Sequence, residues 1–330
     1  MPGSHGAHST AGHGRVSNQF CPRAPAGAAP GQTGGVRFGI TLLTDLPWAE
    51  AAPRWRAAEE MGFDHAWTYD HLVWGGLPDA PWRSGLPVLG AVAATTTRIG
   101  LGTLVASPNL RHPYLLHRDA QALEDLSDGR FLLGVGVGGD LDSGVLATPA
   151  LSRRERVDRF QESVDLLVRL RSEDHVDSDG RWFSVAGART LPPLSRTPLV
   201  VAGNGPRSVR YAARVGDGWV TTGPPADGTA AGVDAWLEGL ATSVRVLDEE
   251  VARTGRDLPR YVLLDHAGTL TGGQGRTSLA SAGFFADLVG RVGELGFTDA
   301  IAHWPRSSAP YAAEERVLEQ VAAEVVQASR

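Results

Sequence analysis

Residues 198–222 read PLVVAGNGPRSVRYAARVGDGWVTT, and this segment sets the fold class. Its apolar ends, 198–202 and 218–222, are predicted to be short strands. The part between them, 206–215, is predicted to be a helix with Pro206 in its first turn. Two strands joined through a helix form a crossover unit, which makes the strands parallel neighbours in one sheet.

The alternation of strand and helix continues on both sides of this unit. The other strands are predicted at residues 36–43, 65–69, 98–105, 131–137, 260–266 and 298–302. A capping box of Ser152 and Glu155 begins a helix after the fourth strand, and 182–190 is predicted to be a small inserted hairpin. Eight strand–helix units predict one (β/α)8 TIM barrel with insertions at its C-terminal face, and an open doubly wound sheet is the alternative.

The amino-acid composition limits the classes of molecule that this protein could bind. The formal net charge is −6, which argues against nucleic acid, and no apolar run is long enough to cross a bilayer. Cys21 is the only cysteine, which excludes an intramolecular disulfide and a thiolate metal cluster and fits our expectation of a cytoplasmic protein. We expect a small-molecule partner and no metal site.

The first 35 residues differ from the remainder of the chain. They are rich in Gly, Ala, Pro, Ser and His, so they cannot bury enough apolar surface to offset the entropy of ordering. His5, His8 and His13 in this segment could bind a metal, but a flexible tail is the favoured interpretation. We therefore expect 1–35 to be a disordered tail and 36–330 to be one barrel domain.

Polar and aromatic residues follow each predicted strand. In a parallel barrel these positions share one rim, which is where such barrels bind ligands. In chain order, the rim residues selected are Asp45, Asp70, His71, Trp74, Leu104, Val105, Gly138, Asp140, Asp142, Gly203, Asn204, Gly205, Thr221, His266, His303 and Trp304. The sequence predicts a ligand site among them.

Asp70 and His71 are the leading catalytic candidates. A carboxylate next to an imidazole after a buried strand suits proton or hydride chemistry. Asp45 and Asp140 are reserve acids, although Asp45 could equally cap a helix and Asp140 could be a solvated loop residue. His303 could be a packed residue at a strand end.

Two glycine-rich segments are candidates for binding a phosphate group. Gly134-Val-Gly-Val-Gly-Gly139 matches the dinucleotide fingerprint, but we discount it because the next helix is expected only at Ser152. Gly203-Asn-Gly-Pro206 is better placed, since it lies between a strand and a helix whose free amides favour an anion. Arg207 and Arg210 could add charge there. A plain tight turn is the alternative.

Taken together, several motifs in order resemble the bacterial luciferase-like family of flavin and deazaflavin oxidoreductases. The resemblance covers about residues 36–305. The motifs are Glu59-Glu-Met-Gly-Phe-Asp64 with Trp67 and Asp70-His71; Arg98-Ile-Gly-Leu-Gly-Thr103 with Ser107-Pro108 and Arg111-His-Pro113; Leu126-Ser-Asp-Gly-Arg130 with Leu133-Gly-Val-Gly136; and Ala202-Gly-Asn-Gly-Pro206 with Gly216-Asp-Gly-Trp219.

The resemblance implies a barrel, commonly a homodimer, that holds a flavin or deazaflavin ring at its carboxyl face. Asp70 and His71 resemble the pair beside the ring, Leu104–Val105 resembles the bulge that supports it, with a cis peptide in many members, and Asn204 with Gly205 would hold the phosphate. The remaining cofactor-binding assignments are Gly138, Asp142, Gly203 and Thr221. The substrate pocket is assigned to Trp74, His266, His303 and Trp304.

The Asp-His pair after a Trp-Thr-Tyr strand resembles the branch of the family that uses coenzyme F420, so the resemblance implies F420 in preference to FMN. The expected function is hydride transfer between reduced F420 and a small, fairly apolar organic substrate. The sugar-phosphate dehydrogenase branch of the family has a glutamate where this chain has Gly139, and a lysine for the substrate phosphate where this chain has Gly223-Pro-Pro225. Because this chain lacks both residues, a sugar phosphate is not expected as its substrate. An FMN- and oxygen-dependent monooxygenase and a non-catalytic flavin-binding relative are the alternatives.

Overall fold

The computed structural model describes residues 35–194, 196–224, 232–265 and 277–330. Within these ranges the parallel strands close into a barrel in the order β1-β10-β9-β8-β7-β4-β3-β2, which confirms the TIM barrel and excludes the open sheet. These strands are β1 (Arg37–Thr41), β2 (His65–Thr68), β3 (Gly100–Thr103), β4 (Phe131–Val135), β7 (Leu199–Ala202), β8 (Gly218–Thr221), β9 (Arg260–Leu263) and β10 (Asp299–His303).

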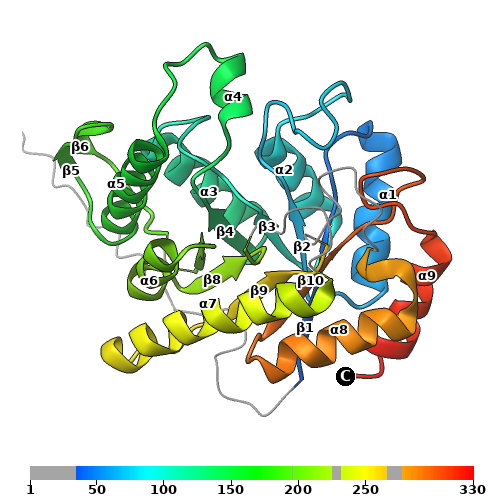
Figure 1. The fold of residues 1–330 in the computed structure, drawn as a ribbon. Coiled ribbons are helices and arrows are strands. Elements are labelled where there is room, and N and C mark those ends of the chain that lie inside the picture. The colour runs from blue at the N-terminus through cyan, green and yellow to red at the C-terminus, as the bar shows by residue number, and fades with distance from the viewer. Residues whose placement is uncertain (1–34, 195, 225–231, 266–276) are drawn as a thin grey trace, which may run out of the picture.

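Helices surround the barrel, as Figure 1 shows. They are α1 (Trp48–Glu60), α2 (Gly85–Thr95), α3 (Pro113–Leu126), α4 (Asp140–Val145), α5 (Arg153–Ser172), α6 (Pro206–Val215), α7 (Val233–Thr254), α8 (Ala282–Glu294) and α9 (Glu315–Val321), with the 3-10 helix η1 (Ser278–Ala280) and the π-helix η2 (Ala322–Val326). The predicted hairpin is present as β5 (Val176–Asp179) and β6 (Ser184–Ala188), and its first strand begins earlier than expected.

One sequence interpretation is wrong. We expected no helix between Gly139 and Ser152, but the short helix α4 begins at Asp140, directly after the glycines. Asp140 and Asp142 stand in its first turn, where negative charge favours helix formation. The glycine segment nevertheless belongs to a closed barrel and not to the open sheet of a dinucleotide-binding domain.

The inside of the barrel is filled by side chains that alternate with those facing the helices. Its apolar layer contains Trp67, Tyr69, Leu104, Val200, Val220, Tyr261, Leu263 and Ile301. Towards the amino ends of the strands, buried Asp299 is bonded to His65 (2.8 Å) and paired with Arg37 (2.9 Å). Packed apolar and paired polar groups close this end, so the space for a ligand lies at the opposite rim.

Candidate active site

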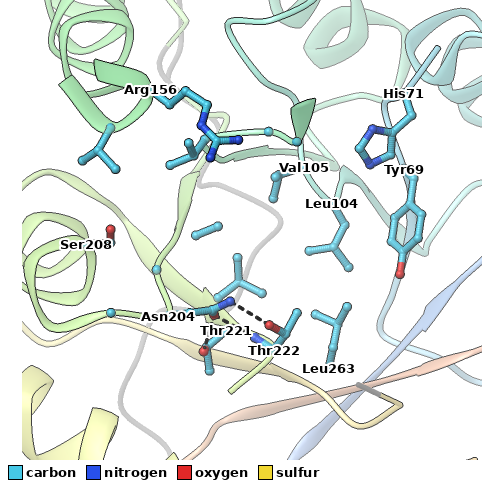
Figure 2. A pocket seen from close by; sticks show the side chains of 18 of the residues that line it. Tyr69, His71, Leu104, Val105, Arg156, Asn204, Ser208, Thr221, Thr222 and Leu263 are labelled. Carbon is cyan, nitrogen blue, oxygen red and sulfur yellow. Dashed lines mark hydrogen bonds between the residues drawn. The ribbon is translucent and has the colours of Figure 1, made fainter. Parts of the chain in front are cut away.

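A cavity of about 460 Å³ opens at the carboxyl ends of the strands (Figure 2). Loops after β2, β3, β4, β7 and β8 contribute to it, together with α5 and α6. Of the residues predicted from sequence, it is lined by His71, Trp74, Leu104, Val105, Gly138, Gly203, Asn204, Gly205 and Thr221. The rim therefore gathers the ring-side and phosphate-side candidates into one space.

Other predicted residues lie outside the lining of this cavity. Asp45 and Trp304 line a smaller pocket next to α1, where Asp45 accepts a hydrogen bond from Arg306. Asp140 is exposed and pairs with Arg156. His303 is buried behind Tyr69, and His266 lies outside the described residues.

Asp70 lies next to the cavity but turns away from it. Its side chain is 2% exposed and forms an ion pair with Arg111 on the loop after β3, with Arg111 Nη2 3.3 Å from Oδ1. This pair joins the ends of two neighbouring strands. The geometry makes Asp70 an anchor for the segment that carries His71.

His71 is held by Asp142, a contact that the sequence did not predict. The Nδ1 atom of His71 lies 2.7 Å from Asp142 Oδ2, and the amide of Leu72 donates to Oδ1 at 2.7 Å. Burial opposes the ionisation of Asp142, but these hydrogen bonds hold its pKa below the ordinary value of 3.8. An ionised carboxylate only accepts, so in the neutral imidazole of His71 the proton lies on Nδ1 and the lone pair on Nε2.

The opposite end of the cavity suits an anion. Gly205 is the N-cap of α6, Pro206 occupies its first turn, and Ser208 and Asn204 line the cavity. The Asn204 amide donates to Thr222 Oγ1 and accepts from Thr221 Oγ1, both at 2.8 Å, and Figure 2 shows these bonds below the cavity. The loop is thereby fixed with its helix N-terminus directed at the ligand space.

The arginines that line this end come from α5, and Arg207 is not among them. Arg207 bonds instead to Asp158 (2.7 Å) and Gln161 (2.5 Å). The lining contains Arg153 and Arg156, which are three residues apart and so share one helix face.

The sequence Ser152-Arg-Arg-Glu-Arg156 contains both of these arginines, but we used it only to predict where a helix begins. Within the described residues, the buried Nε atom of Arg156 has no hydrogen-bond partner, and the guanidinium of this residue lines the cavity.

The wall between the two ends is smooth and largely apolar. The peptide between Leu104 and Val105 is cis, as the resemblance implied. A Cβ atom on Gly136 would lie 2.3 Å from Val105 Cγ2, so only glycine lets the bulge pack against β4. Val220 and Leu263 also line the cavity, so its apolar part can accept a flat ring and its cationic end can accept a phosphate.

Sequence reasoning missed Tyr69, Val220 and Leu263. Each lines the cavity from a strand or its immediate end. Their signal was the alternation along each strand, which sends every second side chain into the barrel.

Comparison with known proteins agrees with this architecture. A family model described as luciferase-like monooxygenase matches residues 25–256. An F420-dependent glucose-6-phosphate dehydrogenase of Beutenbergia cavernae is 37% identical over 201 residues, which are 58% of each chain. One of the same name from Nakamurella multipartita is 34% identical over 224 residues, covering 64% of this chain and 62% of that protein. The matched region thus spans less than two thirds of these relatives.

Solved structures share the fold. An F420-dependent secondary alcohol dehydrogenase in complex with an F420–acetone adduct superposes with a TM-score of 0.74 and 18% identity, covering 90% of this chain and 99% of that one. An F420-dependent tetrahydromethanopterin reductase from Methanopyrus kandleri gives 0.69 and 16%, covering 90% and 100%. The barrel and the matched motifs agree, and the chain belongs to the luciferase-like monooxygenase family.

Proposed function

We propose that this protein is an oxidoreductase that transfers a hydride between coenzyme F420 and a small, fairly apolar organic substrate. The observation that carries the proposal is a single cavity with an anion-binding end, a flat apolar wall and a histidine held by a carboxylate. The names of the relatives support F420 as the cofactor. When bound, F420 supplies the ring carbon that gives or takes the hydride.

The residues of this chain would bind and orient that cofactor. Arg153, Arg156 and the α6 N-terminus at Gly205 would hold the phosphate, and Leu104 with Val105 would support the ring. Asp140 keeps the Arg156 guanidinium in place. The His71 end of the same cavity would then be left for the substrate.

His71 is the proton-handling residue of the proposal. With Nδ1 bonded to Asp142, its Nε2 can take a proton from a substrate or return one. The space beside it is lined by Trp74, Leu104 and Leu263, which favours an apolar alcohol or carbonyl compound over a sugar phosphate. This substrate class differs from that in the names of the matched dehydrogenases.

The test is a titration of the purified full-length protein with F420 and, separately, with FMN, followed by absorbance and fluorescence. We expect tight binding of F420 and anaerobic turnover with members of a panel of small ketones and alcohols. Tight binding of FMN alone, with oxygen consumed as a substrate is hydroxylated, would replace the proposal with a monooxygenase. Binding of F420 without turnover across the panel would indicate a non-catalytic relative.

The expected assembly rests on the resemblance, and the expected location rests on the single cysteine. A homodimer and a cytoplasmic location remain predictions, and light scattering on the purified protein tests the first. In the part of the chain that the structure describes, every helix is too short or too polar to cross a bilayer.

A further inference from the structure

We propose that Tyr69 is a second proton-handling side chain of the cavity, connected through its hydroxyl to His303 and Asp265. This inference rests on the proposed hydride transfer and adds a route that His71 does not provide. Tyr69 follows β2, lines the cavity and stands edge-on to His71, with ring centroids 6.0 Å apart (Figure 2).

Three buried groups form a continuous chain behind the cavity. The Tyr69 hydroxyl lies 2.7 Å from His303 Nε2, and His303 Nδ1 lies 2.9 Å from Asp265 Oδ2. Tyr69 is 7% exposed, and His303 and Asp265 are each 2% exposed. Among the described residues, the three side chains thus lead from the cavity wall into the buried interior.

The hydrogen bonds determine which atom carries each proton. Burial opposes the ionisation of Asp265, but hydrogen bonds from His303 and Ser278 hold its pKa below the ordinary value. The carboxylate is therefore an acceptor, so in the neutral imidazole of His303 the proton lies on Nδ1 and Nε2 accepts from the Tyr69 hydroxyl.

Among the described residues, the titratable side chains in contact with His303 are Asp265, Tyr69 and Tyr311. Tyr311 stacks on His303 with ring centroids 3.6 Å apart, and its hydroxyl lies 3.2 Å from that of Tyr69. Tyr311 can satisfy the Tyr69 oxygen by donating to it. The hydroxyl of Tyr69 therefore has a hydrogen-bond partner even without the buried imidazole and carboxylate. The presence of these two groups beside it favours a functional role for the chain.

The proton movement balances for the oxidation of an alcohol. The substrate C–H bond breaks as its hydride leaves to the oxidised cofactor, and the O–H proton passes to Tyr69 Oη. At the same time the original hydroxyl proton of Tyr69 passes to His303 Nε2, and a C=O bond forms in the substrate. The resulting imidazolium is stabilised by the Asp265 carboxylate. The reverse sequence protonates the oxygen of a carbonyl compound during its reduction.

The experiment compares Tyr69→Phe with Tyr261→Phe. Both variants remove one buried hydroxyl from the same apolar layer inside the barrel, but that of Tyr261 bonds to Arg37, outside the cavity lining. We expect Tyr69→Phe to lower kcat/KM by about 100-fold, in the range of general acid–base catalysis, while the Kd for F420 stays unchanged. Tyr261→Phe keeps the wild-type kcat/KM. A folded Tyr69→Phe variant with wild-type kcat/KM would overturn the inference.

A second measurement does not depend on turnover. In the ¹⁵N-histidine-labelled, cofactor-free wild type, NMR should show His303 neutral and protonated at Nδ1, and Tyr69→Phe should shift the Nε2 resonance. A wild-type imidazole protonated at Nε2 and not at Nδ1 would overturn the relay, even if the phenylalanine variant fails to fold. Failure of the wild type to bind F420 would instead refute the proposed function, and the NMR result would still decide the relay.

Discussion

Replacing Asp142 by asparagine tests the arrangement at His71 most directly. The side chain keeps its shape, and its oxygen can still accept from the Leu72 amide, now 2.7 Å from Oδ1. The new NH₂ group then faces His71 Nδ1, which lies 2.7 Å from Oδ2 in the wild type. An amide that donates there forces the proton of the imidazole onto Nε2, so the lone pair no longer faces a substrate.

The expected loss follows from this tautomer change. Removing a general base costs about 10²- to 10⁴-fold in rate, and the wrong tautomer in a Ser-His-Asp triad costs about 10⁴-fold, so we expect kcat/KM to fall at least 100-fold. The Kd for F420 should change little, because Asp142 is not part of the cavity lining.

The assay is steady-state kinetics with reduced or oxidised F420, with Asp287→Asn as a control that removes a 59%-exposed carboxylate on α8. A folded Asp142→Asn variant whose kcat/KM is within twofold of wild type would refute the proposed role of His71.

Three further results are expected. Arg156→Ala should weaken F420 binding at least tenfold in a fluorescence titration, since charge-assisted hydrogen bonds are strong, whereas Arg154→Ala, 86% exposed on the same helix, should not. A wild-type Kd for Arg156→Ala would contradict the assigned anion site. Asp299→Ala should lower the free energy of unfolding by about 3–5 kcal/mol in urea, because it leaves a buried ion pair without its acid. Burial opposes the ionisation of Asp299, but His65 and Arg37 hold its pKa below 3.8. The wild type therefore keeps the stability that the ionised Asp299 contributes above about pH 4, and loses it as the pH falls through the pKa of Asp299 in the folded protein. If Asp299→Ala loses stability in acid to the same extent as the wild type, this role of Asp299 is refuted. Ser152→Ala should cost about 1 kcal/mol through loss of the capping box, and an unchanged urea midpoint would show that the cap is dispensable.

Much of the fold could be predicted because its signals are local. The unit at 198–222 appears as β7, α6 and β8, since alternating apolar residues and a proline in the first helical turn act within a few residues. Parallel strands place all their carboxyl ends on one rim, so His71, Leu104 and Asn204 could be assigned to one cavity from their positions alone.

Pairings between loops and helices could not be predicted in this way. The sequence identified Asp70 and His71 as neighbours, but only the packed chain shows that Asp70 turns to Arg111 and His71 to Asp142. The helix that carries Arg156 could be recognised from its cap and its apolar periodicity, but only the packed chain shows that the first turns of α5 line the cavity. Periodicity reports which face of an element is buried, whereas side-chain partners depend on how distant segments meet in three dimensions, and no local pattern encodes that distance.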